Sequence, residues 1–251
     1  MSNDFSNTRL VYVFGMRRSG NHAILTWLHG IQNQHSEHFN NQKPNKKLKW
    51  SPKTSPPRDL ITVSYEEVKP LFSRHPLPNA ENQLGSARYV KYVNILRDPL
   101  NLFASRFKHH SLGDETMRKP DFFIDCWKKY ADWALNNNDP DVVNVVYNDW
   151  FESAKSRSVI ASSLCYDFTH TDPEVYLLPE QVPDRTGGSS FSGKEYDGQA
   201  TQMDVNNRYR LMIDHKKFHK FMRRFAKDKD AIRLAKQIFG DWIDDGIGLL
   251  V

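Results

Sequence analysis

A polar segment that follows a hydrophobic stretch near the start of the chain has the composition of a phosphate-binding loop. In GMRRSGNH, Gly15 and Gly20 enclose four residues, which is the spacing of the nucleotide-binding loop G-x-x-x-x-G-K-[ST]. Asn21 and His22 stand where that loop has the lysine for the β- and γ-phosphates and the hydroxyl for Mg²⁺. The segment therefore lacks the side chains with which kinases and GTPases bind a nucleoside triphosphate.

The same segment keeps other groups that attract anions. Backbone N–H groups and the positive end of a helix dipole are expected directly after Gly20, where a helix begins. Arg17 and Arg18 place two guanidinium groups beside them. A strand-to-helix turn with two solvated arginines is the alternative interpretation, and one glycine pair does not decide between the two.

A second segment carries an arginine and a serine at a spacing that suits another phosphate. In YVNILRDPLNLFASRF, Arg97 ends a hydrophobic stretch and Ser105 follows eight residues later. Asn101 and Ser105 are helix neighbours four residues apart, away from the apolar side of the predicted helix. A guanidinium at the strand end and a hydroxyl on the helix could hold a phosphate. A surface pair of Arg97 with Asp98 is the alternative.

Together the two segments resemble the sulfotransferase family, whose members use 3′-phosphoadenosine 5′-phosphosulfate (PAPS). RSGNHAILTWL is similar to the family's 5′-phosphosulfate loop, which reads lysine-serine-glycine-threonine-threonine-tryptophan-leucine. The resemblance implies that Arg97 and Ser105 bind the 3′-phosphate. It also implies a set of residues that bind the phosphosulfate: Arg17, Arg18, Ser19, Gly20, Asn21 and His22.

Two later segments are similar to further parts of the same family. VVYNDW around Tyr147 is similar to a strand-end motif near the adenine, and RTGGSSF is similar to a late loop that closes on the 3′-phosphate. The resemblance therefore implies nucleotide contacts for Tyr147, Arg185, Thr186 and Gly187. Thr186 stands where the family has a basic residue.

The reaction that this resemblance implies is transfer of a sulfuryl group from PAPS to a hydroxyl, or as a second choice to an amine, by in-line displacement. Arg18 and His22 would stabilise the charge on the leaving phosphate, without a metal ion. The family's general base comes from the region that here reads ITVSYEEVKPLFSRHP. Glu66 is the first candidate, and Glu67 and His75 are alternatives. The two glutamates can also be read as ordinary residues at a helix start.

Hydrophobic periodicity predicts the elements that position these residues. Strands are predicted at 10–14, 61–65, 89–96 and 141–147, and helices at 24–31, 100–107, 122–134, 150–164 and within 204–243. Strands that alternate with helices indicate an α/β fold with three layers, in which helices cover both faces of a mostly parallel sheet. The resemblance implies the P-loop-NTPase-like sulfotransferase form of this fold, as a single domain over 1–251.

Composition limits the partners. Lys and Arg number 35 against 30 Asp and Glu, so the formal net charge is only +5, far from that of a dedicated nucleic-acid binder. Two cysteines, a polar N-terminus and the absence of a long apolar run favour a cytoplasmic protein without a membrane partner. The lysine- and proline-rich segment 38–59 is expected to be a mobile basic loop.

The acceptor is expected to be a small molecule or a glycan, and an anionic one if the lysines of the basic loop contact it. Two other functions remain open at this stage. One is a nucleotide phosphotransferase with a degenerate loop, for which Asp149 is the candidate metal-binding acid. The other is a non-catalytic module that binds a polyanion or a nucleotide.

Overall fold

The structure is a computed structural model, and it describes residues 8–32, 36–43, 59–68, 89–164, 178, 191–193 and 195–251. Most of the predicted basic loop and the segment with Arg185, Thr186 and Gly187 lie outside these residues, as does His75. None of the helices in the described ranges is both long and apolar enough to cross a lipid bilayer.

A parallel sheet forms the centre of the molecule. Its strands are β1 (Arg9–Gly15), β2 (Ser36–Phe39), β3 (Leu60–Glu66), β4 (Tyr89–Leu96) and β5 (Val142–Val146), in the order β2-β3-β1-β4-β5. Every pairing in it is parallel, and Gly15 at the end of β1 lies between Glu66 of β3 and Ile95 of β4. The carboxyl ends of the strands therefore bring the predicted phosphate loop next to the predicted base.

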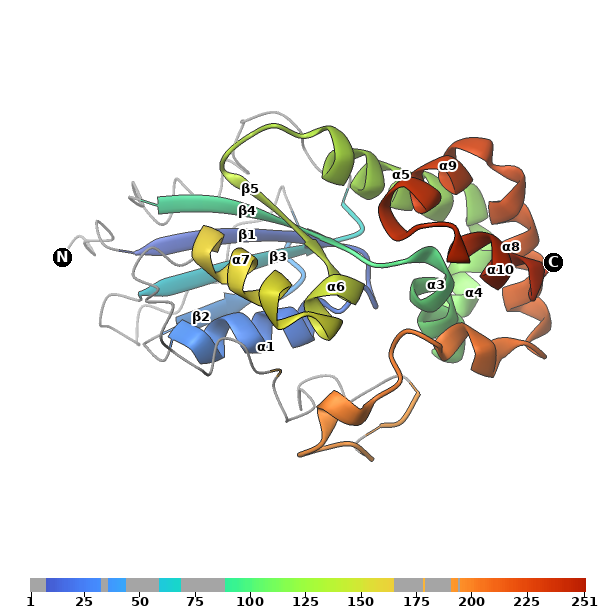
Figure 1. Ribbon diagram of the computed structural model, residues 1–251, viewed down its shortest axis with the longest axis horizontal. Helices are drawn as coiled ribbons and strands as arrows, with labels where there is room; N and C mark the ends of the chain where they lie inside the picture. Colours follow the sequence, from blue (N-terminus) through green and yellow to red (C-terminus); the bar gives the residue numbers. More distant parts are fainter. Residues whose placement is uncertain are drawn as a thin grey trace.

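Helices cover both faces of this sheet. They are α1 (Asn21–Gln32), α3 (Pro99–Lys108), α4 (His110–Arg118), α5 (Pro120–Asn136), α6 (Tyr147–Glu152), α7 (Ala154–Leu164), α8 (Lys216–Lys227), α9 (Lys229–Phe239) and α10 (Trp242–Gly248), with 3₁₀ turns η3 (Ala200–Gln202) and η4 (Arg208–Met212). In Figure 1, α1, α6 and α7 cover one face, whereas α3, α4 and the C-terminal helices gather beyond the carboxyl ends of the strands.

The alternation of side chains along β1 explains the two cores. Leu10, Tyr12 and Phe14 point to one face and join the core formed with α3, α5 and the C-terminal helices. Val11 and Val13 point to the other face and pack with α1 and α7. Because both faces of the strand are buried, β1 reads as a continuous hydrophobic run.

The start of α3 follows the sequence RDP as predicted. The side chain of Asp98 accepts a hydrogen bond from the backbone N–H of Asn101 and so caps the helix. Pro99 occupies the first turn, where its missing N–H costs nothing. This local chemistry fixes where β4 ends, and with it the position of Arg97.

Several boundaries differ from the sequence predictions. His38 and Phe39 belong to the short strand β2 and not to the basic loop. The predicted helix 150–164 is two helices, because Ser153 has an extended backbone between α6 and α7. Tyr147 begins α6 and does not end β5. The helix α4, over 110–118, was not predicted, because its apolar positions are few.

Candidate functional site

The loop between β1 and α1 is held together by its own side chains. Oγ of Ser19 lies 2.7 Å from the carbonyl oxygen of Met16 and 2.7 Å from Oδ1 of Asn21, and its single O–H donates to one of these two acceptors. Asn21 in turn donates its amide to Oε1 of Glu66 at 3.2 Å. Ser19 and Asn21 are both buried, so the structure gives their side chains the task of shaping the loop. The backbone N–H groups of the first turn of α1 are the groups of the loop that could bind an anion.

Gly20 is fixed by two independent constraints. Its φ of 99° lies in the region that side chains avoid, and a Cβ there would overlap the ring of Tyr147. Tyr147 is itself buried and packs close to Trp150, so the ring has little room to move away. The contact between Gly20 and Tyr147 thus joins the phosphate loop to α6.

We expect Gly20→Ala to lower the free energy of unfolding by about 1–3 kcal/mol, since it combines an unfavourable φ with overpacking. Gly30→Ala is the matched control, because Gly30 lies in the same helix region with open space around it. That change should be neutral or raise the stability by up to about 1 kcal/mol. Urea denaturation of both variants measures the difference, and equal midpoints would contradict the constraint at Gly20.

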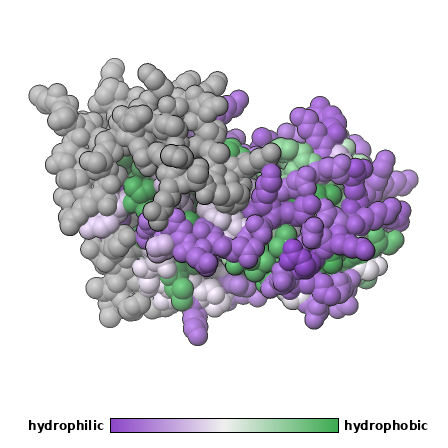
Figure 2. Space-filling model, turned by 90° about the horizontal axis from the view of Figure 1, so that it is seen from above, coloured by the Kyte–Doolittle hydropathy of each residue, from purple (hydrophilic) through white to green (hydrophobic). Residues whose placement is uncertain are grey.

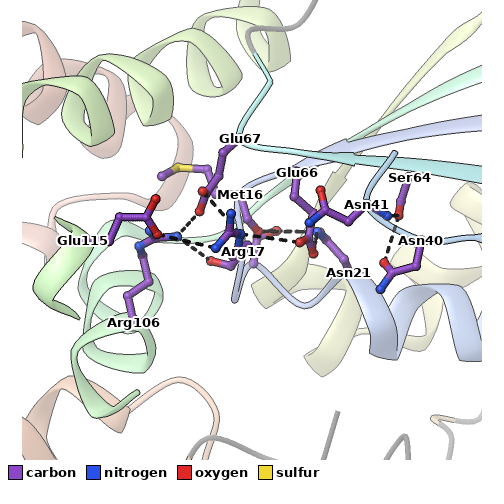
Figure 3. Close-up of polar contacts among 12 residues, drawn as sticks. Met16, Arg17, Asn21, Asn40, Asn41, Ser64, Glu66, Glu67, Arg106 and Glu115 are labelled. Carbon is purple, nitrogen blue, oxygen red and sulfur yellow. Dashed lines mark hydrogen bonds and ion pairs between the residues drawn. The ribbon is translucent and has the colours of Figure 1, made fainter. Parts of the chain in front are cut away.

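A network of acids and arginines lies at the ends of β1 and β3 (Figure 3). Arg106 of α3 is fully buried and forms an ion pair with Glu67, and its Nη1 also donates to the carbonyl of Arg17 at 3.3 Å. Arg17 Nε lies 3.4 Å from Glu67 and 3.8 Å from Glu66. Its Nη1 lies 3.5 Å from Glu115 of α4. The network ties the phosphate loop to β3 and to two helices.

The two candidate bases differ in their surroundings. Burial raises the pKa of Glu66, the charge of Glu67 acts in the same direction, and the hydrogen bond from Asn21 and the charges of Arg17 and Arg18 oppose it. Glu67 has a φ of 59° and is committed to its ion pair with Arg106. Of the two carboxylates, only that of Glu66 is outside the buried ion pair with Arg106. The geometry gives Glu67 a structural role.

Arg18 occupies the tip of the loop in a left-handed conformation, with φ at 76°. Burial lowers the pKa of its guanidinium, the charge of Glu66 raises it, and the charge of Arg106 lowers it. Its carbonyl accepts a hydrogen bond of 3.2 Å from Nη1 of Arg97. The unusual backbone at Arg18 thus turns a carbonyl toward β4 and leaves the side chain half-buried beside Glu66.

Arg97 and Ser105 come together as their spacing predicts. Nη1 of Arg97 lies 3.5 Å from Oγ of Ser105, and both residues are buried. Nη2 donates to the carbonyl of Val205 at 2.6 Å, and the guanidinium stacks over the ring of Tyr147 at 4.7 Å. The pair is enclosed by the segment that precedes η4. The alternative of a surface pair between Arg97 and Asp98 is excluded, because neither residue is exposed.

Arg208 is a third arginine at this place that the sequence did not indicate. It is 8% exposed and begins η4. Burial lowers its pKa to about 10, and the charges of Arg97 and Arg18 act in the same direction while Tyr147 and Asp204 oppose it. Its guanidinium lies 5.3 Å from the ring centroid of Phe191. Three guanidinium groups so close that two of them lower the pKa of the third are typical of a site for an anion.

Hydrogen bonds around the buried Asp98 connect the segment that carries Arg208 to the start of α3. Asp98 accepts hydrogen bonds from the side chains of Asn101 and Asn148, at 3.0 and 2.9 Å. Asn101 also donates to the carbonyl of Asn206 at 2.8 Å and accepts from the backbone N–H of Tyr209 at 3.2 Å. These bonds hold residues 206–209 against α3 and α6. They fix the backbone on which Arg208 is carried.

The structure describes some of the remaining predicted site residues and not others. His22 lies half-buried on the first turn of α1, and its charge joins burial and the charge of His29 in lowering the pKa of His38 to about 4. Tyr147 contacts Gly20 and Arg97, as described above. Arg185, Thr186, Gly187 and His75 lie outside the described residues. Among the residues that the structure does describe, no group of three or more His, Cys, Asp and Glu could hold a metal ion.

The sheet order and the loop after its central strand are those of an α/β fold of the P-loop type. Arginines of the loop, of the end of β4 and of η4 then distinguish this site from a lysine-containing nucleotide site.

The comparison with solved structures agrees. The crystal structure of mouse sulfotransferase SULT7A1 complexed with PAP is similar to this chain over 93% of its length and 91% of the mouse chain. The TM-score is 0.54 and the sequence identity is 14%, so the likeness shows the fold. No family model matches the sequence, and no curated protein sequence matches it either. The chain thus has a sulfotransferase fold, as its sequence segments predicted.

Proposed function

We propose that the protein is a sulfotransferase that moves the sulfuryl group of PAPS to a hydroxyl of a small molecule or glycan. The observation that carries the proposal is the convergence of Arg18, Arg97 and Arg208 beside a loop that lacks the nucleotide-binding lysine. A bound bisphosphorylated nucleotide would neutralise this concentration of charge. The PAP bound to the mouse structure of the same fold supports the same ligand class.

The residues present fit such a nucleotide. The Nε–H of Arg97 is buried and has no hydrogen-bond partner among the described residues, and the hydroxyl of Ser105 lies beside the same guanidinium. A 3′-phosphate would supply acceptors to this guanidinium in place of the carbonyl of Val205. Arg208 would face the same group. We assign to Arg208 the contact that the sequence suggested for Arg185.

PAPS, when bound, supplies an activated sulfuryl group. Arg18 and the N–H groups at the start of α1 would stabilise the charge on the leaving phosphate. Glu66 would accept the proton of the acceptor hydroxyl, and its raised pKa makes its carboxylate a stronger base near neutral pH. Asn21 would hold Glu66 in place through its hydrogen bond. This chemistry needs no metal ion.

The low cysteine count favours action in a reducing compartment, and we infer that the protein acts in the cytoplasm.

The phosphotransferase alternative has less support. It needs an acid at a strand end near the loop, but Asp149 lies within α6. A phosphotransferase would also require a nucleotide with Mg²⁺, so the two functions differ in their nucleotide preference.

The proposal is tested by calorimetric titration of the wild type and of Arg97→Ala with PAP (3′,5′-adenosine bisphosphate) and with ADP, without Mg²⁺. We expect the wild type to bind PAP more tightly than ADP, because only PAP has a 3′-phosphate for Arg97. The variant should lose this preference while an exposed control, Arg224→Ala, keeps it. Equal affinity for both nucleotides, or no binding of either by the wild type, would exclude the sulfotransferase function.

A further inference from the structure

The helix α8 concentrates positive charge to an unusual degree. Its sequence, KKFHKFMRRFAK, contains six Lys and Arg and no Asp or Glu. Without these six, the 35 Lys and Arg of the chain would fall to 29, below the 30 Asp and Glu. The six cations of the helix thus exceed the formal net charge of the whole chain, which is +5. The helix lies at the end of the molecule beyond the carboxyl ends of the strands (Figure 1).

Four of the six cations form a single row, which we call the α8 stripe: Lys216, Lys220, Arg223 and Lys227. At about 100° per residue they fall within about 60° of one another around the helix, and the row is about 16 Å long. All four are exposed. Within the described part of the chain, none of them forms a hydrogen bond, an ion pair or a ring contact. Neighbouring cations in such a row repel one another, so the row costs stability unless something binds it.

The other two cations of α8 show that the chain can neutralise such charges. Lys217 bonds Asp114 of α4 at 2.6 Å, and Arg224 bonds Asp121 of α5 at 2.6 Å. These two lie about 90° around the helix from the α8 stripe, on the side of α4 and α5. Acids therefore border the row on that side, and the uncompensated charge is narrow and linear. Figure 2 shows extensive hydrophilic surface over the helical end of the molecule.

The apolar face of α8 is buried, and this argues against some kinds of partner. Phe218, Phe221, Met222 and Phe225 are buried at 0–1% exposure and form part of the core. The helix therefore offers no apolar face to a lipid surface, which interfacial helices require. It also offers no aromatic ring for stacking, which single-stranded nucleic acids use. The partner that this exposed face fits is one that presents a line of negative charges.

We propose that the α8 stripe is a docking surface for an extended acidic polysaccharide. The carboxylate or sulfate groups of such a chain would pair with successive cations along the row, and the fold would not need to open. The surface is separate from the nucleotide site. It belongs to α8 alone, and its occupation does not depend on PAPS.

The test compares three proteins on two probes in the absence of nucleotide. The stripe variant replaces Lys216, Lys220, Arg223 and Lys227 with Gln. The control variant replaces four exposed cations outside α8 with Gln, so that its net charge equals that of the stripe variant. These four are Lys119, Lys155, Arg210 and Lys229. The probes are heparin, as a soluble acidic polysaccharide, and phosphatidylserine vesicles. Affinity is measured over a range of salt concentrations, and circular dichroism confirms that each protein is folded.

We expect the wild type and the control variant to bind heparin, and the stripe variant to bind it at least about tenfold more weakly at low salt. The slope of log affinity against log salt should become shallower by about 3, from about 0.7 for each cation that contacts a single-stranded polyanion. Equal binding by the two variants would overturn the proposal, as would a wild type that does not bind heparin. Binding of vesicles in preference to heparin, with loss in the stripe variant, would replace the polysaccharide by a membrane surface and so overturn it too. Since nucleotide is absent, none of these outcomes bears on the sulfotransferase proposal.

Discussion

Arg106→Ala should lower the free energy of unfolding by about 3–5 kcal/mol, which is the cost of breaking a buried ion pair by removal of one partner. Arg106 is fully buried, pairs with Glu67, and donates through Nε to Thr116 at 3.0 Å. Its guanidinium also lies 4.3 Å from the ring centroid of Phe123. Alanine would leave Glu67 buried with Arg17 as its remaining ionic partner at 3.4 Å, and would open space beside Phe123.

Urea denaturation at neutral pH measures this loss. Arg224→Ala is the control, because Arg224 and Asp121 form an exposed pair that should contribute less than about 1 kcal/mol. A loss below about 1 kcal/mol for Arg106→Ala would show that Glu67 finds water or another partner. The network of Figure 3 would then not hold the phosphate loop in place.

Arg208→Met should weaken the binding of PAP by about 10- to 100-fold, since a hydrogen bond to a charged group contributes about 1.5–3 kcal/mol. The methionine keeps much of the apolar volume beside Phe191 and Met203 and removes the charge. Without nucleotide, the variant should be as stable as the wild type or more stable, because Arg97 and Arg18 no longer repel a third cation. This combination of weaker binding and undiminished stability distinguishes a ligand contact from a structural role.

Isothermal titration with PAP and thermal unfolding of the free protein measure the two effects. Arg185→Met is the matched comparison, because the sequence suggested Arg185 for this contact. If Arg185→Met loses affinity and Arg208→Met does not, the assignment of Arg208 is wrong and the sequence interpretation stands.

Much of the fold could be predicted from the sequence, because its strands are rich in apolar residues. The central strands β1, β3 and β4 consist mainly of Val, Ile, Leu and aromatic residues, and the edge strand β5 consists mainly of Val, which local periodicity detects. β2 was missed since its four residues, SEHF, pack by tertiary contact with β3 and not by their own hydrophobicity. The break at Ser153 was missed because the sequence around it has no Gly or Pro.

Some residues of the candidate site could likewise be predicted from the sequence, and others could not. The loop and the pair of Arg97 and Ser105 were predictable, because their spacing along the chain sets their distance in space. Arg208 was not, because it reaches the site only through the bonds of residues 206–209 to Asn101. The side chains of Ser19 and Asn21 also differ from expectation in their task, because their hydrogen bonds to one another and to Glu66 depend on the fold of the loop.

The bond between Arg97 and the carbonyl of Val205 joins residues 108 positions apart, and that between Arg97 and Arg18 joins residues 79 positions apart. Such contacts form only after long stretches of chain have been closed into loops, which makes them late events in folding. A ribosome-bound chain that has emerged only as far as α7 would contain the phosphate loop and Arg97 but neither Val205 nor Arg208. The arginines of the candidate site therefore come together only after residues 205–208 have been made, and a nucleotide bound there would stabilise the folded chain. At a ligand concentration of 100 times Kd this would add about 2.7 kcal/mol to its stability.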